Sequence, residues 1–141
     1  MAAIVDYFVA LLPQAEGWLP KWQLLVAVTA FFNTVQNFAT LKFTRRLYSA
    51  APQTVTALQA RTFAIWTLTS AAIRLYAAYN IHTKQVYDLA LFSYLFAFAH
   101  FGSEILIFRS ANINGPVVSP VVVSTVSLVW MFLQYDYYVQ N

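Results

Sequence analysis

Between two lysines the chain reads WQLLVAVTAFFNTVQNFATL (residues 22–41), a stretch of twenty residues without a charge. As an α-helix this stretch would measure about 30 Å, which matches the thickness of the hydrocarbon core of a bilayer. Its apolar residues run on without regular alternation, a pattern that favours a helix over a barrel strand. Because lipid offers no water to the backbone, the stretch predicts a membrane-spanning helix.

Similar stretches follow along the chain, and together they predict an all-α, polytopic membrane protein. We expect a four-transmembrane-helix bundle that forms one domain over residues 1–141. The composition agrees, because 60% of the residues are hydrophobic and 9% are charged, against roughly 25% charged in soluble domains. We interpret residues 1–20, which are apolar but contain Pro13, as an interfacial segment. The predicted helices cover residues 22–41, 59–80, 85–108 and 117–135.

The composition also excludes several kinds of chemistry. The chain has no cysteine, two histidines and three scattered glycines. It therefore lacks thiolate metal ligands, the histidines of a di-iron oxidase and the glycines of a nucleotide-binding loop. Its eight lysines and arginines are spread too thinly to form a nucleic-acid surface. We predict no metal site, no cofactor and no nucleic-acid partner.

Loop charges predict the orientation of the bundle. The loops after the first and third predicted helices hold Lys42, Arg45, Arg46 and Arg109, whereas the opposite side holds Lys21 and Lys84. Basic loops stay in the cytosol. We therefore expect the loops 42–58 and 109–116 to be cytosolic and both termini to face the other side.

Charged residues inside the predicted helices require partners, because an unpaired charge there costs about 2.5–3.5 kcal/mol. The second and third predicted helices fold back around residue 82, so residues equally far from it lie at a similar depth. Arg61 lies 21 residues before this turn and Glu104 lies 22 after it. Arg74 lies eight before it and Asp88 six after it. We predict the ion pairs Arg61–Glu104 and Arg74–Asp88.

Further polar residues fall in the half of the bundle predicted to face the cytosol. His100 and Glu104 share a helix face by their spacing of four. We expect either an interhelical network that fixes the register of the helices or a site for a ligand's polar group or for proton transfer. The predicted cluster consists of Asn33, Gln36, Asn37, Arg61, Thr62, His100, Ser103 and Glu104.

Several short motifs follow one another along the chain in a specific order and spacing. The second predicted helix opens with LQARTF (residues 58–63), followed by IWTL (residues 65–68) and Arg74, and AHF (residues 99–101) and Ser103-Glu104 lie in the third. Over nearly the whole chain these motifs resemble the ergosterol biosynthetic protein 28 family, in its fungal form. One departure is Ala64, where a glycine is expected.

This resemblance implies a non-catalytic scaffold of the endoplasmic-reticulum membrane in ergosterol biosynthesis. It implies as partners the sterol C-4 methyl oxidase, the C-3 sterol dehydrogenase/decarboxylase and the 3-keto sterol reductase, with a further link to the sterol C-24 methyltransferase. Two alternatives stay open: a small membrane sterol isomerase that uses His100 and Glu104, and a subunit that binds and presents sterol. Small residues such as Ala71 and Ala78 allow close helix contact within the bundle or in a homodimer.

Overall fold

The computed structural model describes residues 1–139, apart from the side chains of residues 2 and 3. This part of the chain is all-helical and contains no strand, which confirms the predicted all-α class. The long helices begin and end within three residues of the predicted ranges. They are α2 (Leu19–Ala39), α4 (Ala57–Tyr79), α5 (Lys84–Leu106) and α6 (Gly115–Leu133); the short ones are α1 (Ala2–Leu11), α3 (Lys42–Leu47), the 3-10 helix η1 (Pro52–Thr54) and α7 (Tyr135–Tyr138).

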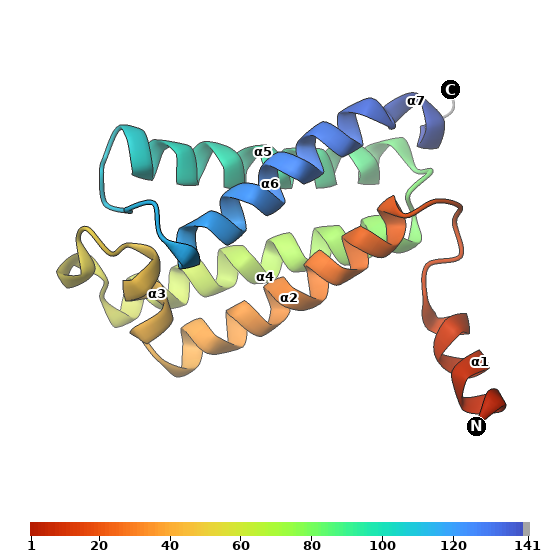
Figure 1. Cartoon of the computed structure of the whole chain (residues 1–141), viewed down its shortest axis with the longest axis horizontal. Helices are drawn as coiled ribbons and strands as arrows, with labels where there is room; N and C mark the ends of the chain where they lie inside the picture. The colour runs from red at the N-terminus through yellow and green to blue at the C-terminus, as the bar shows by residue number, and fades with distance from the viewer. Residues whose placement is uncertain (140–141) are drawn as a thin grey trace.

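The long helices form two pairs, with α2 beside α4 and α5 beside α6 (Figure 1). Small side chains let α2 and α4 approach closely, because Ala27 of α2 and Ala60 and Ala64 of α4 are buried between helices. The hydroxyl of Thr34 donates a hydrogen bond to the carbonyl oxygen of Ala64 at 3.3 Å. The α4–α5 hairpin joins the two pairs into one bundle.

Two helices in the described part of the chain, α5 and α6, are long and apolar enough to cross a membrane. Only 22% of the most apolar 18-residue window of each helix is buried in the molecule. An apolar core helix of a soluble protein would be mostly buried, so these exposed apolar faces indicate association with a membrane. The helices α2 and α4 have 21 and 23 residues but carry more polar side chains, among them the buried Gln23, Asn37 and Arg74.

Buried side chains gather at both ends of the bundle. One cluster, near the α4–α5 turn, contains Tyr87, Tyr94, Met131 and Tyr138. The other, near α3, contains Leu47, Tyr48, Phe63 and Phe101. The two ends of the bundle are therefore each held by a cluster that contains several aromatic side chains.

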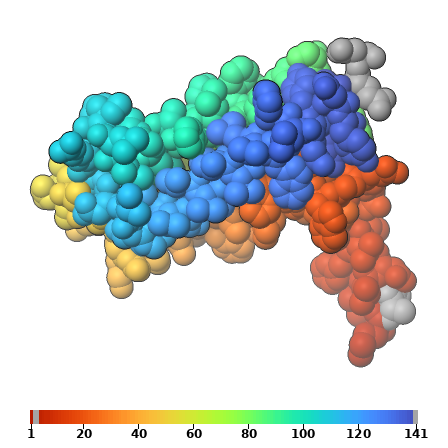
Figure 2. All heavy atoms as spheres, turned by 45° about the horizontal axis from the view of Figure 1, so that its top comes forward, coloured from red at the N-terminus to blue at the C-terminus, as the bar shows by residue number. Residues whose placement is uncertain are grey.

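The first helix, α1, stands away from the bundle and runs across its long direction (Figures 1 and 2). The side chains of residues 4–11 are all exposed, with Ile4 63% and Phe8 62% exposed. One bond ties its end to the bundle: the hydroxyl of Tyr79 donates to the carbonyl oxygen of Leu11 at 2.7 Å. The placement of residues 1–20 at a membrane interface stays a prediction.

Candidate functional site

A cavity of about 410 Å³ lies between the two helix pairs and α3, and it is partly open, because the lining residues Thr29 and Ser119 are exposed. Its walls are mostly apolar and include Phe63, Trp66 and Phe101 at the α3 end. Polar side chains from several helices point into the same space. They are Thr29, Asn33, Asn37, Arg46, Thr67, Ser70, Arg74, Ser119 and Ser124.

The cavity exists because α2 and α6 meet at one end only. There the indole nitrogen of Trp22 donates to the hydroxyl of Ser127 at 2.8 Å, and Nε2 of Gln23 donates to the sulfur of Met131 at 3.0 Å. Toward the other end the short α3 packs against both helices, and the space between them stays open. Pro120, which has no N–H to donate within α6, also lines this space.

The buried cation Arg74 occupies the end of the cavity that is deepest in the bundle. Its side chain is 7% exposed. Nε donates to the hydroxyl of Ser93 at 3.1 Å, and Nη2 donates to the carbonyl oxygen of Ser93 at 3.3 Å. The guanidinium carbon lies 4.1 Å from the centre of the Tyr94 ring, a distance typical of a cation–π contact. These partners hold the side chain but bring it no negative charge.

The predicted Arg74–Asp88 ion pair is wrong. Asp88 instead accepts a bond at 2.7 Å from Lys84, four residues earlier on α5. Arg74 meets α5 at Ser93, and five residues of helix turn Asp88 about 140° away from that contact. Counting residues from the turn therefore gave Arg74 and Asp88 a similar depth, but Asp88 lies on a face of α5 that does not point toward Arg74.

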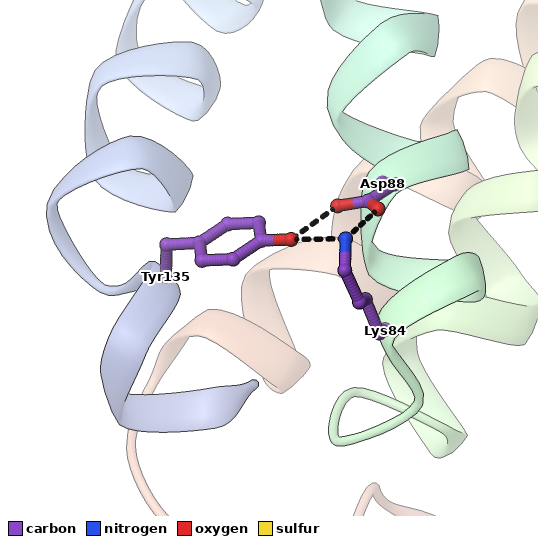
Figure 3. Close-up of polar contacts among 3 residues, drawn as sticks. All are labelled: Lys84, Asp88 and Tyr135. Carbon is purple, nitrogen blue, oxygen red and sulfur yellow. Dashed lines mark hydrogen bonds and ion pairs between the residues drawn. The ribbon is translucent and has the colours of Figure 1, made fainter. Parts of the chain in front are cut away.

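Asp88, Lys84 and Tyr135 form a closed triad at the end of the bundle (Figure 3). The ammonium group of Lys84 donates to the Tyr135 hydroxyl at 2.9 Å, and that hydroxyl donates to the second Asp88 oxygen at 2.7 Å. The triad is partly exposed and connects α5 to α7. Lys84 neutralises the charge of Asp88, so Asp88 provides no counter-charge for Arg74.

The predicted Arg61–Glu104 ion pair is also wrong. Arg61 is exposed, and within residues 1–139 it forms no ion pair. Glu104 instead accepts a short hydrogen bond from the hydroxyl of Ser110. The chain reverses directly after α5, where Arg109 adopts a left-handed backbone (φ 54°) and the Ser110 N–H donates to the Glu104 carbonyl oxygen at 3.0 Å. This reversal supplies the carboxylate with a partner from its own loop.

His100 is enclosed by aromatic rings. Its Nε2 lies 2.7 Å from the hydroxyl of Tyr48, and the Trp66 and Phe101 rings lie 5.1 Å from its ring. Its Nδ1 lies 4.0 Å from a Glu104 oxygen. Burial, together with the charge of Glu104, raises the pKa of Tyr48 above its usual value, so the phenol stays protonated at neutral pH. Neither His100 nor Glu104 lines the cavity.

The predicted polar cluster is divided in the structure. Asn37 accepts a bond from the hydroxyl of Thr44 in α3 at 2.5 Å and donates to the carbonyl oxygen of Asn33 at 2.9 Å. These two asparagines line the cavity, apart from the His100–Glu104 network. Of the other predicted members, Gln36, Arg61 and Thr62 are exposed, and Ser103 donates to the carbonyl oxygen of His100 at 2.8 Å.

The sequence reasoning missed three hydrogen-bond partners of the predicted residues: Tyr48, Ser93 and Ser110. Each bonds to a predicted residue but lies in a loop or on a helix face that spacing alone does not identify. The described residues contain no group of three or more histidine, cysteine or acidic side chains that could hold a metal ion. The cavity thus offers apolar walls and one buried cation, which suit binding.

These features define an all-helical protein with two apolar helices of membrane-spanning length and a largely apolar cavity between its helices. A family model described as Erg28 like protein matches residues 19–129, and the chain belongs to this family. No solved structure matches the chain.

Several curated relatives cover nearly the whole chain, and each is named ergosterol biosynthetic protein 28. The Candida albicans protein is 42% identical over 96% of this chain and 99% of its own length. The Schizosaccharomyces pombe protein is 48% identical over 90% of this chain and 91% of its own. The Saccharomyces cerevisiae protein is 43% identical over 87% of this chain and 84% of its own.

Proposed function

We propose that this protein is a non-catalytic scaffold that holds the enzymes of sterol C-4 demethylation together on the endoplasmic-reticulum membrane. The observation that carries this proposal is membership of a family whose relatives are named for ergosterol biosynthesis. The tethered enzymes are the C-4 methyl oxidase, the C-3 dehydrogenase/decarboxylase and the 3-keto reductase, with a link to the C-24 methyltransferase. Tethering raises the local concentration of each intermediate at the next enzyme.

In this proposal all four long helices span the membrane. The helices α2 and α4 lie beside α5 and α6 (Figure 1) and exceed the length of the hydrocarbon core, at about 1.5 Å per residue. Their outer faces carry large apolar side chains, with Phe32 of α2 62% and Ile65 of α4 53% exposed. Of the polar side chains that lower their hydropathy, Gln23 and Arg74 point inward, whereas Gln36 and Arg61 are exposed near the ends of the two helices.

The contacts of His100 and Glu104 favour a structural role for them. An isomerase would need a proton-transfer pair that reaches its substrate. Here Tyr48 occupies Nε2 of His100 and Ser110 occupies Glu104, and neither residue of the pair borders the cavity. We therefore favour a scaffold over the sterol isomerase.

The cavity supports a second candidate function, a subunit that binds and presents sterol. Its volume of about 410 Å³ falls within the roughly 300–1,000 Å³ of small-molecule pockets. A sterol held there would stay near the tethered enzymes between two reactions. Both functions fit one molecule, because the cavity lies between the helices and the partners would use the outer faces.

Affinity purification of the full chain in mild detergent, with protein mass spectrometry, tests the scaffold. We expect several of the named enzymes to co-purify and a deletion to accumulate several C-4-methylated, carboxylated or 3-keto sterols. A deletion that accumulates one positional isomer, with no enzyme co-purifying, contradicts the scaffold and favours the isomerase.

A further inference from the structure

We propose that the cavity binds an amphipathic carboxylate, with the carboxylate on Arg74 and the apolar body extending toward α3. The ligand class is an elongated hydrocarbon that carries a single carboxylate, as in a sterol acid or a fatty acid. Only the choice of a sterol acid as a probe rests on the proposed function.

The charge of Arg74 determines the head group of this ligand. A guanidinium is charged at any physiological pH and has five N–H donors. Ser93 accepts from Nε and Nη2, while Nη1 donates to no residue among those described and the side chain lines the cavity. No carboxylate between residues 1 and 139 forms an ion pair with it. A buried cation without an anion is costly, and a ligand carboxylate would supply that anion.

The single positive charge of Arg74 favours a carboxylate over other polar head groups. A hydroxyl or ketone would accept a hydrogen bond but leave the charge unneutralised. A phosphate monoester carries up to two charges, and Arg74 is the only cation among the described residues that line the deep end of the cavity. The charge of a carboxylate equals that of one guanidinium, and its two oxygens match the guanidinium's planar geometry.

The shape of the cavity determines the body of the ligand. Along α4 the lining extends from Phe63 to Arg74, which are eleven positions apart, or about 16.5 Å along the helix. The end opposite Arg74 is walled by Phe63, Trp66 and Phe101. An elongated apolar body fits such walls, since each buried CH₂ group contributes about 0.8 kcal/mol. Arg46 of α3, exposed at this end, attracts anions toward the cavity.

Binding measured on the purified full chain in detergent tests this assignment. The probes are a sterol 4-carboxylate, its methyl ester and oleate. We expect at least one acid to bind the wild-type protein, and the ester to bind at least about tenfold more weakly than the sterol acid if that acid binds. Arg74→Gln should weaken acid binding about 10- to 100-fold, the loss typical of a charge-assisted bond. Arg61→Gln, an exposed arginine on the same helix, should retain binding within about threefold, and Arg46→Gln at the α3 end should weaken binding less than Arg74→Gln does.

A second pair of variants keeps Arg74 intact. Ala97 lines the cavity on α5, whereas Ala99 on the same helix is exposed and does not. Ala97→Phe should fill the cavity and abolish acid binding, and Ala99→Phe should bind as the wild type does. If Arg74→Gln fails to fold, this pair of variants still tests whether the acid binds in the cavity.

Each outcome supports or overturns the assignment. Binding of either acid that depends on both Arg74 and Ala97 supports it, and the tighter acid identifies the source as sterol or fatty acid. Failure of both acids to bind, or binding that depends on Arg46 and not on Arg74, overturns it. The scaffold is judged separately, because Arg74→Gln protein that still co-purifies the enzymes leaves tethering intact whether or not it binds acid.

Discussion

Tyr48 and Ser110 are the hydrogen-bond partners of His100 and Glu104, the two residues of α5 that a proton-transfer site would use. Tyr48 reaches His100 from the loop after α3, and Ser110 reaches Glu104 from the loop after α5. Both contacts are partly buried, and in low dielectric such bonds are worth more than in water. At the scale of single residues, therefore, this network fastens the cytosolic loops proposed above to the bundle.

Substitution of His100 tests the role of this network. His100→Gln should still accumulate and co-purify with its partners, because a glutamine amide can bond to the Tyr48 hydroxyl. Tyr48→Phe should lower stability by about 1 kcal/mol, the net value of one hydrogen bond. Thermal unfolding in detergent measures both, and Tyr76→Phe on the exposed face of α4 is the matched control. Abundant His100→Gln protein that loses function about 10²- to 10⁴-fold would indicate acid–base catalysis instead.

A double-mutant cycle tests the partner of Glu104. Glu104→Gln combined with Ser110→Ala should show a coupling energy of about 1 kcal/mol or more, since the bond involves a charge. Glu104→Gln combined with Arg61→Gln should show coupling near zero, because these residues form no ion pair. Chemical or thermal unfolding of the three single variants, the two double variants and the wild type gives both values. The reverse result would restore the Arg61–Glu104 pair.

These partners could not be predicted from spacing. Counting residues from the turn near residue 82 gives the level of a side chain along the bundle, but the face of the helix depends on how neighbouring helices rotate. Asp88 and Ser93 lie close in sequence, yet they point to different neighbours, Lys84 with Tyr135 and Arg74 respectively. A short loop bond such as Ser110 to Glu104 also leaves no periodic signal in the sequence.

At the scale of the elements, Asn114 joins the start of α6 to the loop after α3. Its Oδ1 accepts from the N–H of Val117 at 3.2 Å, which caps the helix, and its Nδ2 donates to the hydroxyl of Ser49 at 2.8 Å. One side chain therefore ends the turn, starts α6 and holds α3 in place. The helix boundaries were predictable for this reason: capping residues and prolines mark them locally.

Variants at Asn114 separate these two roles. Asn114→Ala should lower stability by about 1–2 kcal/mol, because it removes both the cap and the bond to Ser49. Asn114→Asp keeps the cap and loses only the donor, so it should recover much of that stability. The exposed Asn112 provides the control Asn112→Ala. Equal unfolding temperatures for all three variants and the wild type would contradict this account.

At the scale of the whole molecule, hydropathy predicted the number and extent of the long helices but not the cavity. The helices follow from uninterrupted apolar stretches, which any single segment displays. The cavity depends on how α2 and α6 diverge and where α3 inserts, and these are relations between segments far apart in the sequence. Arg74 was identified as a charge that needs a partner, and the structure places it in the cavity wall.

Cysteine labelling tests the proposed four-span topology. The chain has no cysteine, and Gln53 and Gln85 are exposed at opposite ends of the bundle. In sealed, right-side-out vesicles of endoplasmic reticulum, Gln53→Cys should react with an impermeant maleimide. Gln85→Cys should react only after detergent is added. Labelling of both sites in intact vesicles would contradict the four spans, and the opposite pattern would reverse the orientation.

The direction of α1 has a consequence for how such a bundle would sit in a bilayer. If the four long helices stand upright, a helix that runs across them lies flat along the membrane plane, at the lumenal surface in the proposed orientation (Figure 1). Its apolar side chains would resist transfer into the lumen, and the charge of Asp6 would resist transfer into the hydrocarbon. Because α1 lies on one side of the bundle only, it also opposes tilting of the bundle toward that side. Residues 1–11 would thus determine how deeply the helical bundle sits in the membrane and how far it tilts.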